Sequence, residues 1–170
     1  MANILLLDDD QNHLNAMWRV LWLNGEHDAE RFISPSAALA RAREKDFDVV
    51  ITDWRMPEMD GARFLSEFRQ LQPATFRVLL STHINAELFR AAINSAQIHH
   101  FMQKPCDGFV LMQVVNEGLA QVELSRELER LRTELEMTRR LLEVRTRLLE
   151  SVAGQCPTVL PQGWKSAHSH

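Results

Sequence analysis

The 170-residue chain has few cysteines, no excess of positive charge and no long apolar run. Cys106 and Cys156 are too few and too far apart for a disulfide framework or a zinc site, so we expect a reducing, cytoplasmic location. The formal net charge of −4 excludes a generally basic nucleic-acid-binding protein. Charged residues interrupt every apolar stretch well before membrane-spanning length, and the first residues lack the positive region of a signal peptide. We therefore expect no membrane association.

Glycine and proline are scarce between residues 117 and 152, which contain one glycine and no proline. Leucines fall there on the a and d positions of a heptad: Leu124, Leu128, Leu131, Leu135, Leu142 and Leu149. Thr138 and Arg145 occupy two further d positions. The pattern predicts a coiled-coil helix over 123–152 that continues the last helix of a domain over 1–122, with a flexible tail over 153–170.

The charges beside this leucine pattern are balanced, with seven Glu and seven Arg from Glu123 to Glu150. Glu127 and Glu134 lie at g positions. Arg132 and Arg139 lie at e positions five residues further on, as in a parallel two-stranded coiled coil. We therefore expect a homodimer through this helix. A helix that folds back on its own domain is the alternative.

The first 122 residues alternate short apolar runs with amphipathic segments. The expected strands are 4–7, a less marked one at 30–33, 49–52, 78–81 and 99–103. The expected helices are 13–23, 36–45 (capped by Ser34 or Ser36), 62–71, 86–95 and one that begins near Asp107. Strands separated by helices predict parallel βα units, and hence an α/β fold with a doubly wound parallel sheet and helices on both faces.

Acidic residues follow two of the expected strands. Asp8, Asp9 and Asp10 come after the first strand, and Asp53 comes after the third. The carboxyl ends of parallel strands meet at one edge of a sheet, where ligands bind. Clustered carboxylates are costly without a cation, and their oxygens suit Mg²⁺. We interpret Asp10 as a solvated loop acid.

The same edge is expected to carry a lysine and two hydroxyl groups. Lys104 follows the fifth strand and supplies a positive charge for an anionic oxygen. Ser81 and Thr82 lie at the end of the fourth strand. Together with the acids, these residues predict a site for a phosphoryl group in which one carboxylate is the nucleophile.

The runs ILLLDDD, DVVITDWRMPEMDG and HFMQKPCD, in this order and at this spacing, resemble the receiver domain of bacterial two-component response regulators. The resemblance covers residues 3–122. It implies a five-stranded flavodoxin-like (CheY-like) sheet of order 2-1-3-4-5. It also implies a phosphoacceptor switch rather than an enzyme, with at most self-phosphorylation and autodephosphorylation.

The resemblance also implies roles for the acidic residues and the lysine. Asp53 would accept a phosphoryl group from a sensor histidine kinase or a phosphotransfer protein. Asp9, Asp53 and the backbone carbonyl of Arg55 would bind Mg²⁺ directly, and Asp8 would act mainly through a bound water. Lys104 would contact a phosphoryl oxygen.

Further positions match the switch residues of receivers. Ser81 is expected as the switch hydroxyl, and a different alignment gap gives Thr82. Phe101 occupies the aromatic switch position. Arg55 and His83 flank the acyl phosphate and tune its hydrolysis, and we expect Arg55 to lengthen the phosphorylated lifetime.

Two backbone features are implied as well. The bond between Lys104 and Pro105 is expected to be cis. Gly61 is expected to adopt a positive φ in the turn beside the site.

Two other readings of the chain compete with a complete receiver switch. It can be a fragment of a longer effector, such as a cyclic-dinucleotide phosphodiesterase. Asp8-x-Asp10 after an apolar strand also resembles haloacid-dehalogenase-type phosphatases, although Asn12 departs from that pattern. Direct nucleic-acid binding is disfavoured, because the leucine-rich segment has no basic region.

Overall fold

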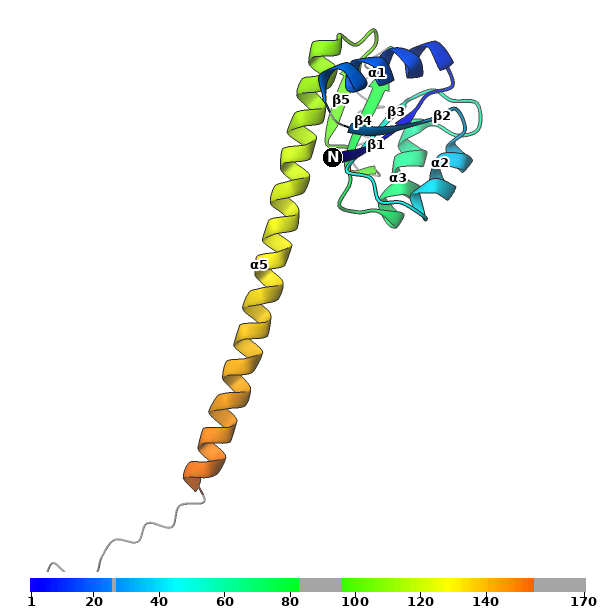
Figure 1. Ribbon diagram of the computed structural model, residues 1–170. Helices are drawn as coiled ribbons and strands as arrows, with labels where there is room; N and C mark the ends of the chain where they lie inside the picture. The colour runs from blue at the N-terminus through cyan, green and yellow to red at the C-terminus, as the bar shows by residue number, and fades with distance from the viewer. Residues whose placement is uncertain (26, 83–95, 155–170) are drawn as a thin grey trace, which may run out of the picture. The chain divides into compact units, whose positions relative to one another are not determined.

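The computed structural model describes residues 1–25, 27–82 and 96–154, and it contains one five-stranded parallel sheet (Figure 1). The order of the strands is β2-β1-β3-β4-β5, as the resemblance to receiver domains implies. The strands are β1 (Ala2–Leu7), β2 (His27–Phe32), β3 (Val49–Asp53), β4 (Phe76–Ser81) and β5 (His100–Gln103). The less marked strand near residue 30 is therefore present, and it pairs with β1 at one edge of the sheet.

The helices of the described ranges are α1 (Gln11–Asn24), α2 (Pro35–Ala42), α3 (Gly61–Leu71) and α5 (Gly108–Gly154). Asp10, Ser34 and Asp60 cap α1, α2 and α3, and each side chain accepts a hydrogen bond from a backbone N–H of the first turn. Asp107 does the same for α5. The helix expected at 86–95 lies outside the described residues.

Helix α2 ends at Ala42, earlier than the predicted limit of residue 45. The N–H groups of Arg43 and Glu44 bond to carbonyls three residues back, which tightens the last turn. Lys45 lies beyond the helix and pairs with Asp28 and Glu30 on β2. The tightened last turn therefore ends α2 before residue 45, and Lys45 is left to bind the edge strand.

Apolar side chains cover both faces of the sheet. Alternate residues of β1 point to opposite sides, so Ile4 and Leu6 belong to one buried cluster and Leu5 and Leu7 to the other. The first cluster includes residues of α1 and α5, and the second includes residues of α2 and α3. This three-layer arrangement is the predicted α/β architecture.

The compact unit around the sheet spans Met1–Arg126. Val122 on α5 is buried, and the Arg126 guanidinium lies 2.7 Å from the carboxylate of Asp48. Asp48 is itself buried and accepts a hydrogen bond from the backbone N–H of Asn3. These contacts place Val122 and Arg126 in the same unit. The boundary expected at residues 122–123 stays a prediction.

The second unit begins at Glu127 and contains the distal part of α5. Its leucines at the heptad positions are all more than half exposed. In the described ranges, every helix is either too short or too polar to cross a membrane.

Candidate functional site

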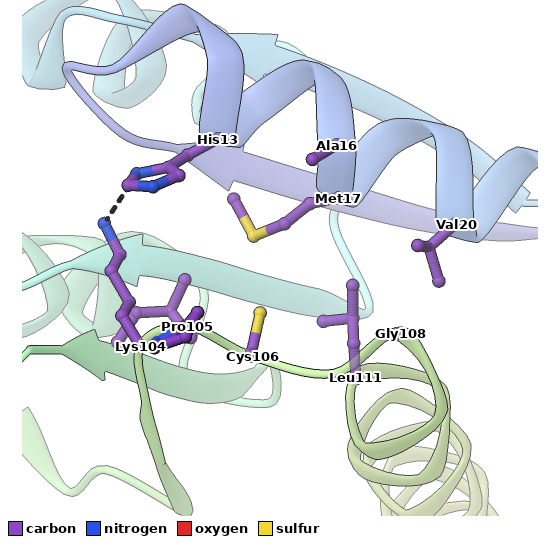
Figure 2. Close-up of a pocket in the computed structure, with 10 residues that line it drawn as sticks. His13, Ala16, Met17, Val20, Lys104, Pro105, Cys106, Gly108 and Leu111 are labelled. Atoms are coloured by element: carbon purple, nitrogen blue, oxygen red, sulfur yellow. Dashed lines mark hydrogen bonds between the residues drawn. The ribbon is translucent and has the colours of Figure 1, made fainter.

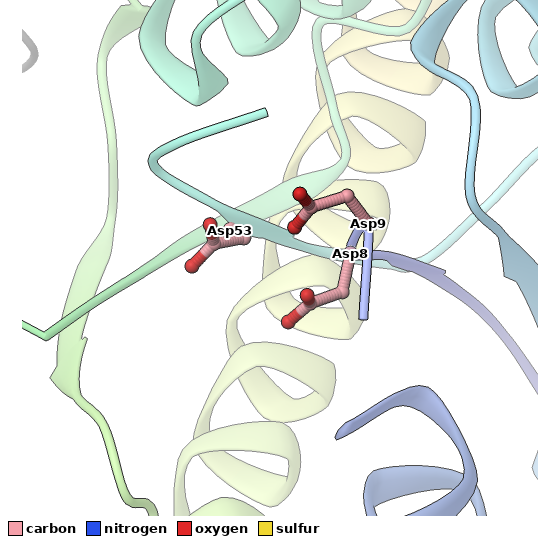
Figure 3. Close-up of side chains that lie close together, drawn as sticks. All are labelled: Asp8, Asp9 and Asp53. Carbon is pink, nitrogen blue, oxygen red and sulfur yellow. The ribbon is translucent and has the colours of Figure 1, made fainter. Parts of the chain in front are cut away.

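Three carboxylates meet at the carboxyl ends of β1 and β3 (Figure 3). Asp8 and Asp9 directly follow β1, and Asp53 is the last residue of β3. One oxygen from each lies within 4.8 Å of the other two. Asp8 and Asp53 are buried, whereas Asp9 is exposed. An oxygen-rich group of this kind, open on the side of Asp9, suits a hard divalent cation.

Lys104 lies between the two buried carboxylates. Its ammonium group is 2.6 Å from an oxygen of Asp8 and 2.6 Å from an oxygen of Asp53, and its side chain is 9% exposed. Burial favours the neutral amine, but the hydrogen bonds to Asp53 and Asp8 outweigh it and raise the pKa of Lys104. The lysine is therefore charged at neutral pH. The bond between Lys104 and Pro105 is cis, as predicted.

Asp10 caps α1 beside the carboxylate group. Its side chain accepts a hydrogen bond from the N–H of Asn12, and this bond lowers the pKa of Asp10. Its own N–H donates to Asp8 Oδ1 at 2.9 Å. Asp10 thus fixes the orientation of Asp8, a role that the solvated-acid interpretation missed.

His13 is a second residue that the sequence did not assign to this site. Its Nδ1 lies 3.5 Å from the Lys104 ammonium and 3.7 Å from an oxygen of Asp8. The sequence held a signal for this residue: Asp10 is of a type favoured at the N-cap, and His13, three residues later, then lies in the first turn of α1, close to the cap. His13 therefore borders the site on the α1 side.

The opposite side of the site is formed by β4 and the loop after β3. Ser81 is the last residue of β4 and is buried, whereas Thr82 is exposed. The Arg55 guanidinium donates to the Thr82 hydroxyl at 3.1 Å, and the Arg55 N–H donates to Asp53 Oδ2 at 2.9 Å. Arg55 therefore links the carboxylate of Asp53 to the end of β4.

One further predicted residue lies near this side. Phe101 is a half-buried residue of β5 that packs against the cluster containing α2 and α3. His83 lies outside the described residues.

A polar cavity of about 320 Å³ joins these groups. It is lined by Asp8, Asp9, Asp10, His13, Asp53, Trp54, Arg55, Ser81, Thr82 and Lys104. The cavity thus combines four acids, one lysine, one arginine and two hydroxyl groups. Such a set can hold a divalent cation together with a phosphoryl group.

Gly61 is required beside the site, but not for the predicted reason. Its φ is not positive. A Cβ at this position would overlap the carbonyl oxygen of Asp53, and it would also meet the side chain of Leu79. The glycine therefore lets α3 begin in close contact with the end of β3, and the expected left-handed conformation is wrong.

A second cavity, of about 190 Å³, lies between α1 and the start of α5 (Figure 2). Met17, Val20 and Leu111 supply apolar walls, and Cys106 lies between the two helices. Burial raises the pKa of the Cys106 thiol, so the reactive thiolate is disfavoured. This agrees with an ordinary half-buried cysteine.

Known proteins resemble the chain over the same region. The curated relatives include the transcriptional regulatory protein ZraR of Salmonella typhimurium strain LT2, 33% identical over 118 residues, which are 69% of this chain and 26% of ZraR. The hydrogenase transcriptional regulatory protein HoxA of Cupriavidus necator is 28% identical over 76% of this chain and 27% of HoxA. This chain thus spans about a quarter of the length of these relatives.

Solved structures give the same picture. The structure described as adenylate cyclase from Rhodopirellula baltica has a TM-score of 0.71 and 30% identity, and the match covers 76% of this chain and 96% of that one. The signal receiver domain of an HD domain-containing protein from Pseudomonas fluorescens Pf-5 has a TM-score of 0.70 and 27% identity, over 74% and 92% of the two chains. Residues 4–116 match the family described as the response regulator receiver domain. With its CheY-like sheet and its acidic group at the carboxyl ends of β1 and β3, the chain belongs to the response regulator receiver domain family.

Proposed function

We propose that the protein is a phosphoacceptor switch of two-component signalling and that Asp53 is the residue that accepts the phosphoryl group. The observation that carries the proposal is the pairing of Asp53 with Lys104 next to Asp8 and Asp9. A carboxylate oxygen of Asp53 attacks the phosphorus of a phosphohistidine on a sensor kinase or phosphotransfer protein, and the histidine nitrogen leaves. Lys104 then balances charge on a phosphoryl oxygen.

The chain's own residues fit Mg²⁺. Asp9 and Asp53, with the backbone carbonyl of Arg55, would hold the ion, and Asp8 would act mainly through a water. Bound Mg²⁺ would neutralise charge on the phosphoryl oxygens. Ser81, or alternatively Thr82, supplies the switch hydroxyl at the end of β4. Phe101 on β5 is the aromatic switch residue, whose side chain changes rotamer when the switch hydroxyl moves toward the phosphoryl group.

Phosphorylation with a small donor tests the proposal. The full chain is incubated with Mg²⁺ and acetyl phosphate, and bound phosphate is measured by intact mass. We expect one added phosphoryl group that is released by hydroxylamine, as an acyl phosphate is, and that is absent in Asp53→Asn. Asp28→Asn is the matched control, because Asp28 lies on β2, pairs with Lys45 and does not line the cavity, so it should leave phosphate uptake intact.

Two results would contradict the switch. Uptake that persists in Asp53→Asn would remove Asp53 from its role. Steady release of phosphate that depends on Asp8 would instead favour a phosphatase of the haloacid-dehalogenase type.

The output is proposed to pass through α5, which begins beside the site at Gly108 and continues into the leucine-rich segment. We propose that two copies pair through the heptad leucines. Glu127 and Glu134 of one copy would meet Arg132 and Arg139 of the other. A change in the packing of α5 on the sheet would then alter the dimer or the docking of a partner. ZraR and HoxA are named as transcriptional regulatory proteins, and both are longer than this chain. For this chain we propose only the receiver switch and the pairing of α5.

A further inference from the structure

The cavity of about 190 Å³ between α1 and the start of α5 reaches the apolar interior of the receiver (Figure 2). Three residues that line it, Met17, Leu80 and Leu111, are at most 4% exposed and belong to the core cluster of α1, the sheet and α5. Val20 and Cys106 line it as half-buried residues. Core residues therefore bound this space, which we call the α1–α5 recess.

Small residues keep the α1–α5 recess open. Ala16 on α1 is exposed, so only a methyl group stands at this part of the rim. Gly108 is the first residue of α5, and a Cβ there would lie 3.0 Å from a methyl group of Val20. The glycine thus lets α5 begin in close contact with α1. The recess has closely packed walls and a rim through which a small molecule can enter.

The size of the recess restricts what can occupy it. An apolar protein cavity of about 150 Å³ is large enough to hold benzene. The α1–α5 recess, at about 190 Å³, has room for a ring with a substituent or for a small fused ring. Water is a poor occupant, because a buried water needs about two to four polar partners and the buried lining side chains are apolar.

Two sulfur atoms favour an aromatic occupant. The side chains of Met17 on α1 and Cys106 after β5 both point into the space between α1 and the start of α5 (Figure 2). A thioether sulfur makes favourable contacts with aromatic rings, and a free cysteine behaves as a small apolar group. A flat ring between these two side chains is therefore better suited than a saturated chain.

The charges at the polar end of the recess favour a neutral occupant. His13 and Lys104 line this recess and also line the cavity with the carboxylates. The Lys104 ammonium is already balanced by Asp8 and Asp53, each at 2.6 Å. An anionic ligand would meet Asp8, and a cationic ligand would meet Lys104. A hydroxyl or a ring N–H can instead bond to the imidazole of His13 without adding a charge.

We propose that the α1–α5 recess is a binding site for a small neutral aromatic molecule of the size of phenol or indole. The ring would lie between Met17 and Cys106, with its hydroxyl or N–H group toward His13. The site is formed by α1, the residues after β5 and the start of α5. Binding therefore requires neither Mg²⁺ nor phosphorylation of Asp53.

Direct titration tests the proposal. Isothermal titration calorimetry is carried out on the full chain, without Mg²⁺ or a phosphoryl donor, with indole and phenol as probes. Benzoate and benzylamine are controls of similar size that carry opposite charges. We expect a dissociation constant below about 1 mM for indole and at least about tenfold weaker binding of both charged controls. Asp53→Asn should bind indole as the wild type does, which separates this result from the proposed phosphoacceptor role.

Alkylation of Cys106 reports whether the probe occupies the recess. The rate of modification by N-ethylmaleimide is followed by intact mass in a Cys156→Ser protein, in which Cys106 is the remaining thiol. Saturating indole should slow the modification at least threefold, because the ring covers the thiol. Benzoate at the same concentration should leave the rate unchanged.

A variant that fills the recess makes the test specific. Ala16→Leu places a larger apolar side chain at the rim and should weaken indole binding at least tenfold. The matched control is Arg19→Leu, which places the same side chain at an exposed position of α1 that does not line the recess. It should bind indole as the wild type does. Both positions are exposed, so circular dichroism should show the same helix content in the two variants.

Four outcomes would overturn the proposal. Failure of both indole and phenol to bind, with unchanged alkylation of Cys106, would leave the recess without a ligand of this class. Equal binding of the charged controls would contradict selection for a neutral molecule. Indole binding that persists in Ala16→Leu and does not protect Cys106 would place the ligand elsewhere. Alkylation that slows with rising protein concentration, without any probe, would assign the recess to a second copy of the chain.

Discussion

Lys104 places a cation between the two buried carboxylates of the site, and this charge opposes the entry of a metal ion. Lys104→Met should therefore raise the affinity for Mg²⁺ by at least about tenfold, because one positive charge in contact with the ligands is removed. Isothermal titration calorimetry measures this affinity directly.

A matched control exists beside the edge strand β2. Lys45 also joins two acids, Asp28 and Glu30, but away from the site. Lys45→Met should leave Mg²⁺ affinity unchanged. If Lys104→Met had no effect either, the carboxylates around Lys104 would not be the metal site.

Arg55 spans the site from Asp53 to Thr82 and is placed to shield an acyl phosphate from water. Arg55→Ala should shorten the phosphorylated lifetime several-fold, measured by loss of phosphate after the donor is removed. Arg55→Lys keeps the charge but lacks the planar guanidinium, and it should have an intermediate lifetime. Loss at the wild-type rate in Arg55→Ala would contradict a shielding role.

At the scale of elements, the junction of β3 and α3 depends on the absence of a side chain at Gly61. Gly61→Ala should lower the free energy of unfolding by about 1–3 kcal/mol, because the new methyl group overlaps the Asp53 carbonyl and the Leu79 side chain. Urea denaturation measures the change. Gly25→Ala is a useful comparison, since the three atoms nearest to an added Cβ there belong to the ring of His27. A stable Gly61→Ala protein with normal phosphate uptake would refute this tight packing.

The pairing of β4 and β5 makes stability depend on pH. His99 Nδ1 accepts a hydrogen bond from the N–H of Arg77, and its ring stacks on Phe76. Burial and then the charge of Arg77 lower the pKa of His99 to about 4, from the ordinary value of 6.5. Between these values the unfolded chain binds the proton and the folded chain does not, so the free energy of unfolding should fall as the pH drops from 6.5 to 4.

Comparison with His99→Asn isolates this contribution. Asparagine retains an acceptor near the N–H of Arg77 but does not titrate. Urea denaturation between pH 7 and pH 4 should show a shallower loss of stability in the variant than in the wild type. Parallel curves for the two proteins would mean that His99 contributes nothing to the acid response.

At the scale of the whole molecule, the leucine-rich part of α5 should make the protein a dimer. Sedimentation or light scattering gives the mass in the presence and absence of the phosphoryl mimic beryllofluoride. We expect a dimer in at least one of the two conditions, and Leu128→Ser with Leu135→Ser should be monomeric in both. An unchanged wild-type monomer would end the dimer proposal and favour a helix that serves other partners.

Local patterns were sufficient for most of this architecture. The apolar runs predict the five strands, and the rule that parallel strands end at one edge predicts that Asp8, Asp53 and Lys104 lie at that edge. Features that depend on contacts between distant segments could not be read in this way. The roles of His13 and Gly61 depend on the packing of helices against strand ends, which no periodicity reveals.

The contact of Arg126 with Asp48 is of the same kind, because it joins residues far apart in the sequence. This contact determines how short the receiver can be made before it loses stability. A chain shortened to Val122 would leave the buried Asp48 carboxylate without its cation. Protease cleavage beyond Arg126 should release a receiver that still folds, whereas cleavage just after Val122 should yield a fragment that melts at a lower temperature.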